Sequence, residues 1–413
     1  MSPIGKARTD GGAAQREALR ERALAIHRTS IVLNAAVMSS QVLIHPGRDI
    51  GRRWQGLAPG TGDVDLPRLR DGEVNVLWQA VCGSSGEDET RIPLQGLELL
   101  DTLYTDILDR YPDDFALALT VEDVRRIRGQ GKVAVLLGMQ AGQFLGGSVR
   151  ALRVFRRLGV QYMTLTHAWT NLLCDSSSGR VRWHGLSEVG RQVVREMGVR
   201  GVIPDISHAT DQAALQILAL SRGPVIATHS NARALCCPPV EMARAIGAES
   251  LAERNLSDDL MRRLADRGGV ACVNFAPALV SQAFADAYPK LKELTTELTA
   301  HLEALRLAQP GDVERHREEK ACFMVEHGVP PATLEDVADH VEHLAGVAGW
   351  DHVGLGADWE GTGGHHPRHL EDVSKVPLLT AELLRRGHGE TEIRRFLGEN
   401  VLRVLKETQR LAG

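Results

Sequence analysis

Short runs of apolar, largely β-branched residues recur along the chain, and amphipathic segments rich in arginine, glutamate and leucine separate most of them. Eight such runs are present, at 31–37, 74–81, 133–139, 162–166, 201–206, 224–228, 269–275 and 352–357. Runs that are apolar throughout predict strands buried on both faces, as in a parallel sheet covered by helices. Their alternation with helices predicts an α/β fold, a closed (β/α)8 TIM barrel. No G-x-G-x-x-G turn follows the first run, which disfavours an open nucleotide-binding sheet.

The length of the chain, 413 residues, suits one large barrel with insertions. Residues 1–12 are small and polar and predict a flexible N-terminal tail, so the barrel domain is expected to span 13–413. Residues 38–70 predict a long loop after the first strand. The charged, helical residues 280–330 predict an excursion beside the barrel mouth, and segments of this kind often form lids or dimer contacts.

Composition narrows the class of protein. A hydrophobic content of 43% and a charged content of 24% describe a soluble globular chain. The net charge of -5 gives no indication of a nucleic-acid partner. No apolar stretch approaches the roughly 18–20 residues that a membrane span needs. The six cysteines form no C-x-x-C pair, and the N-terminus lacks the apolar core of a secretory signal. We therefore expect a cytoplasmic protein with reduced thiols.

Polar residues stand at or just beyond the ends of the last five runs. They are His167, Asp205, His208, His229, Asn274 and Asp358. In a (β/α)8 barrel the reactive groups lie at the C-terminal ends of the strands, so these side chains are expected to share one site. Any one of them alone would fit a core or helix-capping role at least as well.

Two neutral imidazoles and a carboxylate are ligands that suit zinc, with a position left open for water. His208 and His229 are the expected ligands, and Asp358 is expected to bind metal, to accept the proton of the water, or both. Asp358 as a helix N-cap is the alternative. Arg233 could bind a substrate carboxylate through its planar fork, or form only a surface salt bridge. Asn274 is the second expected substrate-binding residue.

Several motifs, taken in order, closely resemble the membrane dipeptidase (renal dipeptidase-like) family. They include YMTLTHAWTN (162–171), PVIATHSNARALC (224–236), RNLSDDLMRRLADRGGVACVNF (254–275) and HVGLGADWEG (352–361). The resemblance extends from about residue 64 to the C-terminus and implies a TIM barrel of the metal-dependent hydrolase type. It also implies cleavage of dipeptides with a pair of zinc ions, and a homodimer.

The resemblance assigns roles residue by residue. His208 and His229 match the two histidine ligands of one zinc ion. Asp358 matches the carboxylate that contacts the other zinc and handles the proton, and His167 matches the histidine that supports the tetrahedral intermediate. Arg233 matches the arginine that pairs with the carboxylate of the substrate.

Two positions depart from the family pattern. The first strand of the family ends in a His-x-Asp pair, where this chain has Asn34-Ala35-Ala36, and its bridging glutamate corresponds to Gln140. A bridging carboxylate offsets the charge of two closely spaced dications, so its loss disfavours a paired site. The expected cofactor is one zinc ion held by the two histidines, with Gln140 or Asp358 as a further ligand. A weakly held or absent metal is left open.

Three functions follow from this pattern. The first is a dipeptidase-like hydrolase that acts on a dipeptide or similar small amide with one metal ion or an incomplete metal site. The second is a repurposed, metal-independent enzyme that catalyses condensation, elimination or isomerisation of an amino-acid derivative. The third is a non-catalytic homologue that binds a small ligand or a partner. An insertion at 238–253, relative to the family, is expected to reshape the substrate entrance.

Overall fold

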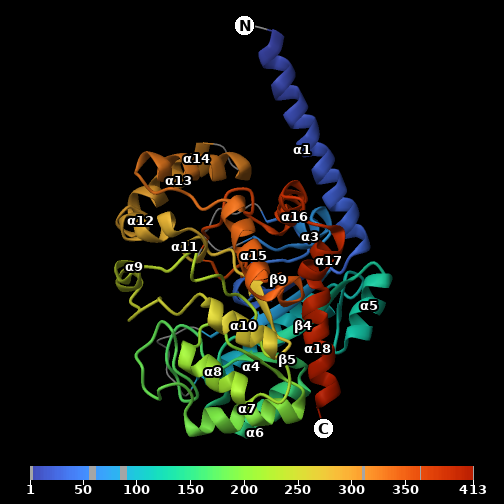
Figure 1. The fold of residues 1–413 in the computed structure, drawn as a ribbon, viewed down its shortest axis with the longest axis vertical. Coiled ribbons are helices and arrows are strands. Elements are labelled where there is room, and N and C mark those ends of the chain that lie inside the picture. Colours follow the sequence, from blue (N-terminus) through green and yellow to red (C-terminus); the bar gives the residue numbers. More distant parts are fainter. Residues whose placement is uncertain (1–2, 55–61, 84–90, 309–311, 363, 413) are drawn as a thin grey trace.

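The computed structural model describes residues 3–54, 62–83, 91–308, 312–362 and 364–412 (Figure 1). Its strands are β1 (Leu33–Val37), β2 (Val76–Val81), β3 (Phe115–Leu117), β4 (Val133–Met139), β5 (Val160–Thr164), β6 (Ile203–Asp205), β7 (Ile226–Ala227), β8 (Val270–Val273) and β9 (Val353–Leu355). Eight of them form a parallel sheet in the order β1-β2-β4-β5-β6-β7-β8-β9. Each of these eight falls largely within one of the eight apolar runs, so the predicted strand order is confirmed.

The sheet closes into a barrel between its first and last strands. The amide of Met38 donates to Trp359 O at 3.3 Å, and that of Asp358 donates to Ala36 O at 3.1 Å. The side chain of Asn34 takes part, because its Oδ1 accepts from the amide of Ala357 at 2.8 Å. These contacts complete a (β/α)8 TIM barrel.

Helices cover the outer face of the barrel. They include α4 (Ile92–Leu103), α5 (Val121–Gly129), α6 (Val149–Arg157), α7 (Glu188–Arg200), α8 (Asp211–Leu220), α10 (Asp258–Asp266), α15 (Leu334–Ala348) and α18 (Asn400–Leu411). Several begin at a serine or threonine N-cap: Ser187 accepts from the amide of Gly190, and Thr210 from that of Ala213. Gly201 caps the C-terminus of α7, and its φ of 66° suits a residue without a Cβ.

Two elements differ from expectation. The N-terminal helix α1 (Pro3–Thr29) begins ten residues before Ala13, so the segment predicted as a flexible tail is helical from Pro3. Once a helix has formed, each residue added to its end gains one hydrogen bond, so the helix can extend into a segment whose composition does not predict it. Strand β3 was not predicted. Its three residues pair with the first half of β4, a segment too short for a periodic pattern.

The region between β1 and β2 contains α2 (Ser39–Leu43) and α3 (Leu66–Asp71). The long loop predicted over 38–70 therefore begins and ends in short helices, and its residues 55–61 lie outside the described part. Near the C-terminus α16 (Val376–Arg385) packs against α1, and α17 (Glu390–Arg394) precedes α18. No helix in the described part of the chain is long and apolar enough to cross a membrane.

A helical group stands beside the barrel mouth (Figure 1). It consists of α9 (Val240–Ala245), α11 (Pro277–Val280), α12 (Gln282–Glu293), α13 (Thr295–Ala308) and α14 (Val313–Glu326). These helices share an apolar cluster separate from that of the barrel, with Phe284, Leu291 and Leu298 among its buried members. The residues predicted as a helical excursion, 280–330, supply most of this group.

Candidate active site

The polar residues singled out in the sequence come from consecutive strand ends. Asp205 ends β6 and His208 lies three residues beyond it, while His229 lies two residues beyond β7. His208 and Asp358 have left-handed backbones, with φ of 67° and 61°. Residues other than glycine rarely adopt this conformation, and those that do concentrate at functional sites.

A chain of hydrogen bonds fixes the orientation of His229. Thr228 donates its hydroxyl proton to Asp205 Oδ2 at 2.5 Å, so the Thr228 oxygen is free to accept from His229 Nδ1 at 2.7 Å. Asp205 is held in place by Thr164 and by the amides of Ser207 and Thr228. His229 is therefore the tautomer with its proton on Nδ1 and a lone pair on Nε2, the form that can bind a metal.

Gln140, His208 and Arg254 lie close to the Nε2 atoms of the two histidines. Gln140 Nε2 lies 2.7 Å from His229 Nε2, and His208 Nε2 lies 2.9 Å from the same atom. Arg254 Nη2 lies 3.2 Å from His208 Nε2. Burial and the charge of Arg254 lower the pKa of both histidines well below the usual range, so both are neutral at pH 7.

His167 completes a row of three imidazoles. Its ring centroid lies 4.4 Å from that of His208, and its Nε2 lies 3.5 Å from Cys82 Sγ. Burial, followed by the charge of Arg254, lowers the pKa of His167 to about 4. A neutral His167 can donate one hydrogen bond to a substrate oxygen without carrying a charge of its own.

Asp358 is the carboxylate of the site. Burial raises its pKa to about 7, although Arg254 and a hydrogen bond from Asn274 act in the opposite direction. Asn274 Nδ2 donates to Asp358 Oδ2 at 3.1 Å, while Asp358 Oδ1 has no partner among the described residues. A carboxyl group with a pKa near 7 can both accept and release a proton at neutral pH.

Arg254 is a residue of the site that was not predicted from the sequence. Its side chain is 4% exposed and donates to His229 O, to Ser230 Oγ and to His208. No ion pair joins it to a carboxylate within the described residues, although burial lowers its pKa only to about 10 and leaves it charged. Arg254 opens the RNLSDD motif, which pointed to the family but gave no sign that this arginine turns inward.

Arg233 forms an ion pair in the structure. It was expected to bind the substrate carboxylate. In the structure its guanidinium forms a bidentate ion pair with Asp211, with Nη1 at 2.8 Å and Nη2 at 2.5 Å from the carboxylate oxygens. Its Nε donates to Asn255 O at 2.9 Å. The salt bridge weighed as the alternative is thus present, and Arg254 lines the cavity where Arg233 does not; substrate binding by Arg233 stays a prediction.

Asn274 and Gln140 contact other residues of the site, and their predicted roles in substrate and metal binding stay predictions. Asn274 is fully buried and holds Asp358 in place, so it acts on the carboxylate and not on the cavity surface. Gln140 turns its amide nitrogen to His229, and its Oε1, the atom that could bind a metal, has no partner among the described residues. His208 Nδ1 is likewise without one.

The site opens into a cavity of about 500 Å³. His208, Arg254 and Asp358 line one part of it, and residues of α9, α12 and α13 line another. In the described part of the chain, no group of three or more His, Cys, Asp or Glu side chains is placed to hold a metal ion.

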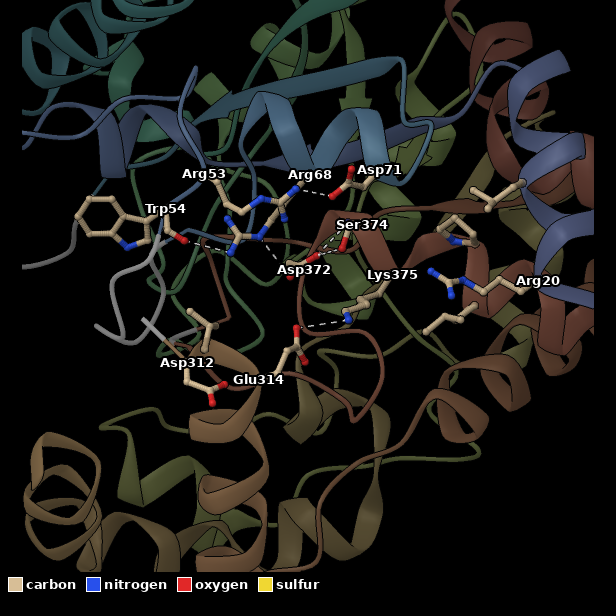
Figure 2. Close-up of a pocket in the computed structure, with 14 residues that line it drawn as sticks. Arg20, Arg53, Trp54, Arg68, Asp71, Asp312, Glu314, Asp372, Ser374 and Lys375 are labelled. Carbon is tan, nitrogen blue, oxygen red and sulfur yellow. Dashed lines mark hydrogen bonds and ion pairs between the residues drawn. The ribbon is translucent and has the colours of Figure 1, made fainter. Parts of the chain in front are cut away.

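A second cavity, of about 700 Å³, shares no lining residue with the first. Figure 2 shows its charged side chains arranged largely as pairs, with Arg68 beside Asp372 and Lys375 beside Glu314. Arg68 also pairs with Asp65, and Arg317 with Asp372. This cavity lies between α1, α3 and α14, away from the strand ends. Its cations and carboxylates neutralise one another, so it does not resemble an active site.

Comparison with known proteins fits this geometry. The family model described as "Membrane dipeptidase (Peptidase family M19)" matches residues 20–413. The chain belongs to the membrane dipeptidase family. It is 33% identical over 369 residues to the dipeptidase tcpJ of Claviceps purpurea (strain 20.1), covering 87% of this chain and 73% of the relative. Its identity to the dipeptidase aclJ of Aspergillus oryzae (strain ATCC 42149 / RIB 40) is 30% over 359 residues, covering 85% of this chain and 71% of the relative.

Solved structures agree with the membrane dipeptidase assignment. The probable dipeptidase PvdM of Pseudomonas aeruginosa superimposes with a TM-score of 0.77 at 25% identity, covering 96% of this chain and all of the other. A metallopeptidase of the same family superimposes with a TM-score of 0.71 at 20% identity, covering 92% of this chain and 99% of the other, a likeness of fold. The family is metal-dependent, and the relatives of this chain are dipeptidases.

Proposed function

We propose that this protein hydrolyses a dipeptide or similar small amide, and that Arg254 binds the carboxylate of the substrate. The supporting observation is the charged, buried guanidinium of Arg254 beside His208, with no carboxylate paired to it in the described residues. Burying an unpaired charge is costly, so such a group is retained where a ligand supplies the opposite charge. A carboxylate matches the guanidinium fork in both shape and charge.

Two histidine nitrogens support binding of one metal ion and not two, and a third ligand would have to move toward them, because no three His, Cys, Asp or Glu side chains of the described residues already surround one point. His229 presents a lone pair at Nε2, fixed by Thr228, and His208 Nε2 lies 2.9 Å away, so one ion could bind both nitrogens. On β1, Asn34 Oδ1 is used to close the barrel and Ala36 has no donor, so a second ion lacks ligands on that side. Further ligands for the single ion would be Asp358, or Gln140 after its amide turns over.

Each group of the site then has a role in hydrolysis. A bound ion would supply a water molecule acidic enough to ionise near neutral pH. Arg254 orients the substrate through its carboxylate, and Asp358 Oδ1 accepts a proton from the attacking water and passes it to the leaving amine. His167 donates a hydrogen bond to the oxygen on which negative charge develops. Asn274 keeps Asp358 turned toward the substrate.

One observation favours a second function. The lone pairs of His208 and His229 already meet donors, the guanidinium of Arg254 and the amide of Gln140. Such a site could act without metal on an amino-acid derivative, with Asp358 and His167 moving protons directly in an elimination, condensation or isomerisation.

The experiment that separates these functions combines elemental analysis with a substrate screen. The purified protein is loaded with zinc, assayed against a set of dipeptides, and assayed again after treatment with a chelator. About one zinc per chain and dipeptide hydrolysis that the chelator abolishes are expected. Turnover that proceeds unchanged in the metal-free protein would overturn the metal-assisted proposal in favour of the second function.

A further inference from the structure

The cavity at the barrel mouth has two chemically different ends. Its polar end contains His208, Arg254 and Asp358, the groups of the proposed active site. Its other end is lined mostly by apolar side chains of the helical group and the loop after α9, among them Met242, Leu251, Phe284, Leu298 and Leu302, with Lys292, Thr295 and Thr299 as the polar members from α12 and α13. We call this second end the apolar chamber.

The apolar chamber is built by segments outside the repeating strand-helix units of the barrel. Met242 and Leu251 belong to the insertion 238–253, and Leu298 and Leu302 lie on α13. Phe284 and Leu298 are 2% and 6% exposed, so they belong to the packed cluster of the helical group while still lining the cavity. The chamber is thus an apolar recess that reaches the protein surface at Ile246 and Thr299, both of which are exposed.

A recess of this kind has a thermodynamic cost unless something fills it. Apolar walls that face water are unfavourable, because removing apolar surface from water releases free energy roughly in proportion to its area. Pockets that bind small molecules combine mostly apolar walls with a few polar groups that fix the orientation of the ligand. The chamber and the polar end form one cavity, so the same ligand can reach both.

We propose that the apolar chamber binds an aliphatic chain, carried by the substrate whose carboxylate pairs with Arg254. This inference rests on the proposed function only for the carboxylate at the polar end. It names a substrate class, small amides with a carboxylate at one end and an extended aliphatic group at the other. Lys320, a charged side chain that also lines the cavity, donates to Gly364 O at 2.7 Å, so its ammonium group has a partner within the protein.

Ligand binding tests this inference without relying on turnover. The affinities of the full-length protein for N-acetyl-, N-butyryl-, N-hexanoyl- and N-octanoylglycine are measured by calorimetry. These ligands keep the carboxylate and the amide constant and lengthen only the aliphatic chain. The affinity is expected to rise by up to about fourfold for each added methylene until the chamber is full. Equal affinities for the four ligands would overturn the inference.

Two substitutions test where the aliphatic chain of the ligand binds. Leu302→Trp and Thr299→Trp add a large ring at the chamber wall of α13 and are expected to flatten the dependence on chain length. Thr299 is exposed, so its variant tests the chamber even if the partly buried Leu302 position tolerates the ring poorly. Leu307→Trp is the matched control, because Leu307 lies on the same helix, is 70% exposed and is not among the cavity-lining residues.

The outcomes distinguish the inference from the proposed function. An unchanged dependence on chain length in both α13 chamber variants, or an equal flattening in Leu307→Trp, would place the chain elsewhere and overturn the inference. Dipeptide hydrolysis together with equal affinities would support the proposed function and overturn the chamber alone. Chain-length-dependent binding that Leu302→Trp removes would support the chamber even if no amide were hydrolysed.

Discussion

The guanidinium of Arg254 lies beside His208, with Nη2 3.2 Å from Nε2, and the same His208 nitrogen lies 2.9 Å from His229 Nε2. A fixed positive charge therefore borders the position where both imidazoles could hold a metal ion. Two unit charges 4 Å apart interact by about 4 kcal/mol in a partly screened protein environment. An anion bound to Arg254 would reduce this repulsion, so substrate carboxylate and metal are expected to favour each other in the site.

Removal of the Arg254 charge tests its role in binding. Arg254→Gln is expected to lower kcat/KM for a dipeptide by about 10- to 100-fold, because a charge-assisted pair with the carboxylate is lost. Arg233→Gln is the matched control and is expected to keep kcat/KM within a few-fold, since Arg233 pairs with Asp211. Steady-state kinetics with thermal unfolding of both variants provides the measurement. Equal losses in the two variants would contradict the assignment.

A carboxylate at position 140 is expected to strengthen metal binding. Gln140→Glu places a negative charge beside His229 Nε2, where Gln140 now puts an amide nitrogen, and should raise zinc affinity by at least about tenfold. The stoichiometry should stay at one, because Asn34 and Ala36 provide no ligands for a second ion. Competition with a chromogenic chelator measures both quantities. Gln192→Glu, at an exposed position of α7, controls for the added charge.

The hydrogen-bond chain behind His229 is expected to support its metal affinity. Thr228→Val removes the hydroxyl that accepts from Nδ1 and donates to Asp205, and should weaken zinc binding by about 10- to 100-fold. Thr228→Ser retains the hydroxyl and should bind zinc almost as the unaltered protein does. The same chelator competition applies. If Thr228→Val bound zinc as tightly as Thr228→Ser, the orientation of His229 would not depend on this contact.

Stability is expected to fall on acidification partly through His340. This buried imidazole accepts from the amide of Ala232 at Nδ1 and donates to Val280 O from Nε2, and burial lowers its pKa to about 4. The unfolded chain gains the proton near pH 6.5, so the contribution of His340 is complete above that pH and is lost as the pH falls toward 4. The full loss is about 3 kcal/mol.

Chemical unfolding at several pH values measures this loss. His340→Asn, which can still accept from Ala232, should be less stable at pH 7 but should lose less stability between pH 6.5 and pH 4. The matched control is His184→Asn, at an exposed position with a φ of 52° that asparagine tolerates. If the two variants showed the same dependence on pH, His340 would not contribute to it.

The sequence alone determined the order of strands and helices and the strand ends that carry polar groups. Short apolar runs that alternate with amphipathic segments predict buried parallel strands, and a parallel barrel brings all its C-terminal strand ends to one face. His167, His208, His229 and Asp358 could therefore be assigned to one site. The short strand β3 and the extension of α1 to Pro3 left no periodic pattern to read.

The tertiary structure alone decided which arginine enters the site and what the excursion encloses. Arg233 lies four residues after His229 along the chain, yet its guanidinium pairs with Asp211. Arg254 lies in a loop 46 residues after His208 and contacts that histidine. The direction of a side chain depends on contacts between distant segments, and so does a cavity between α9, α12 and α13. The strand ends predicted the location of the candidate site. Packing between distant segments decided that Arg254 supplies its positive charge and that α9, α12 and α13 supply its apolar side chains.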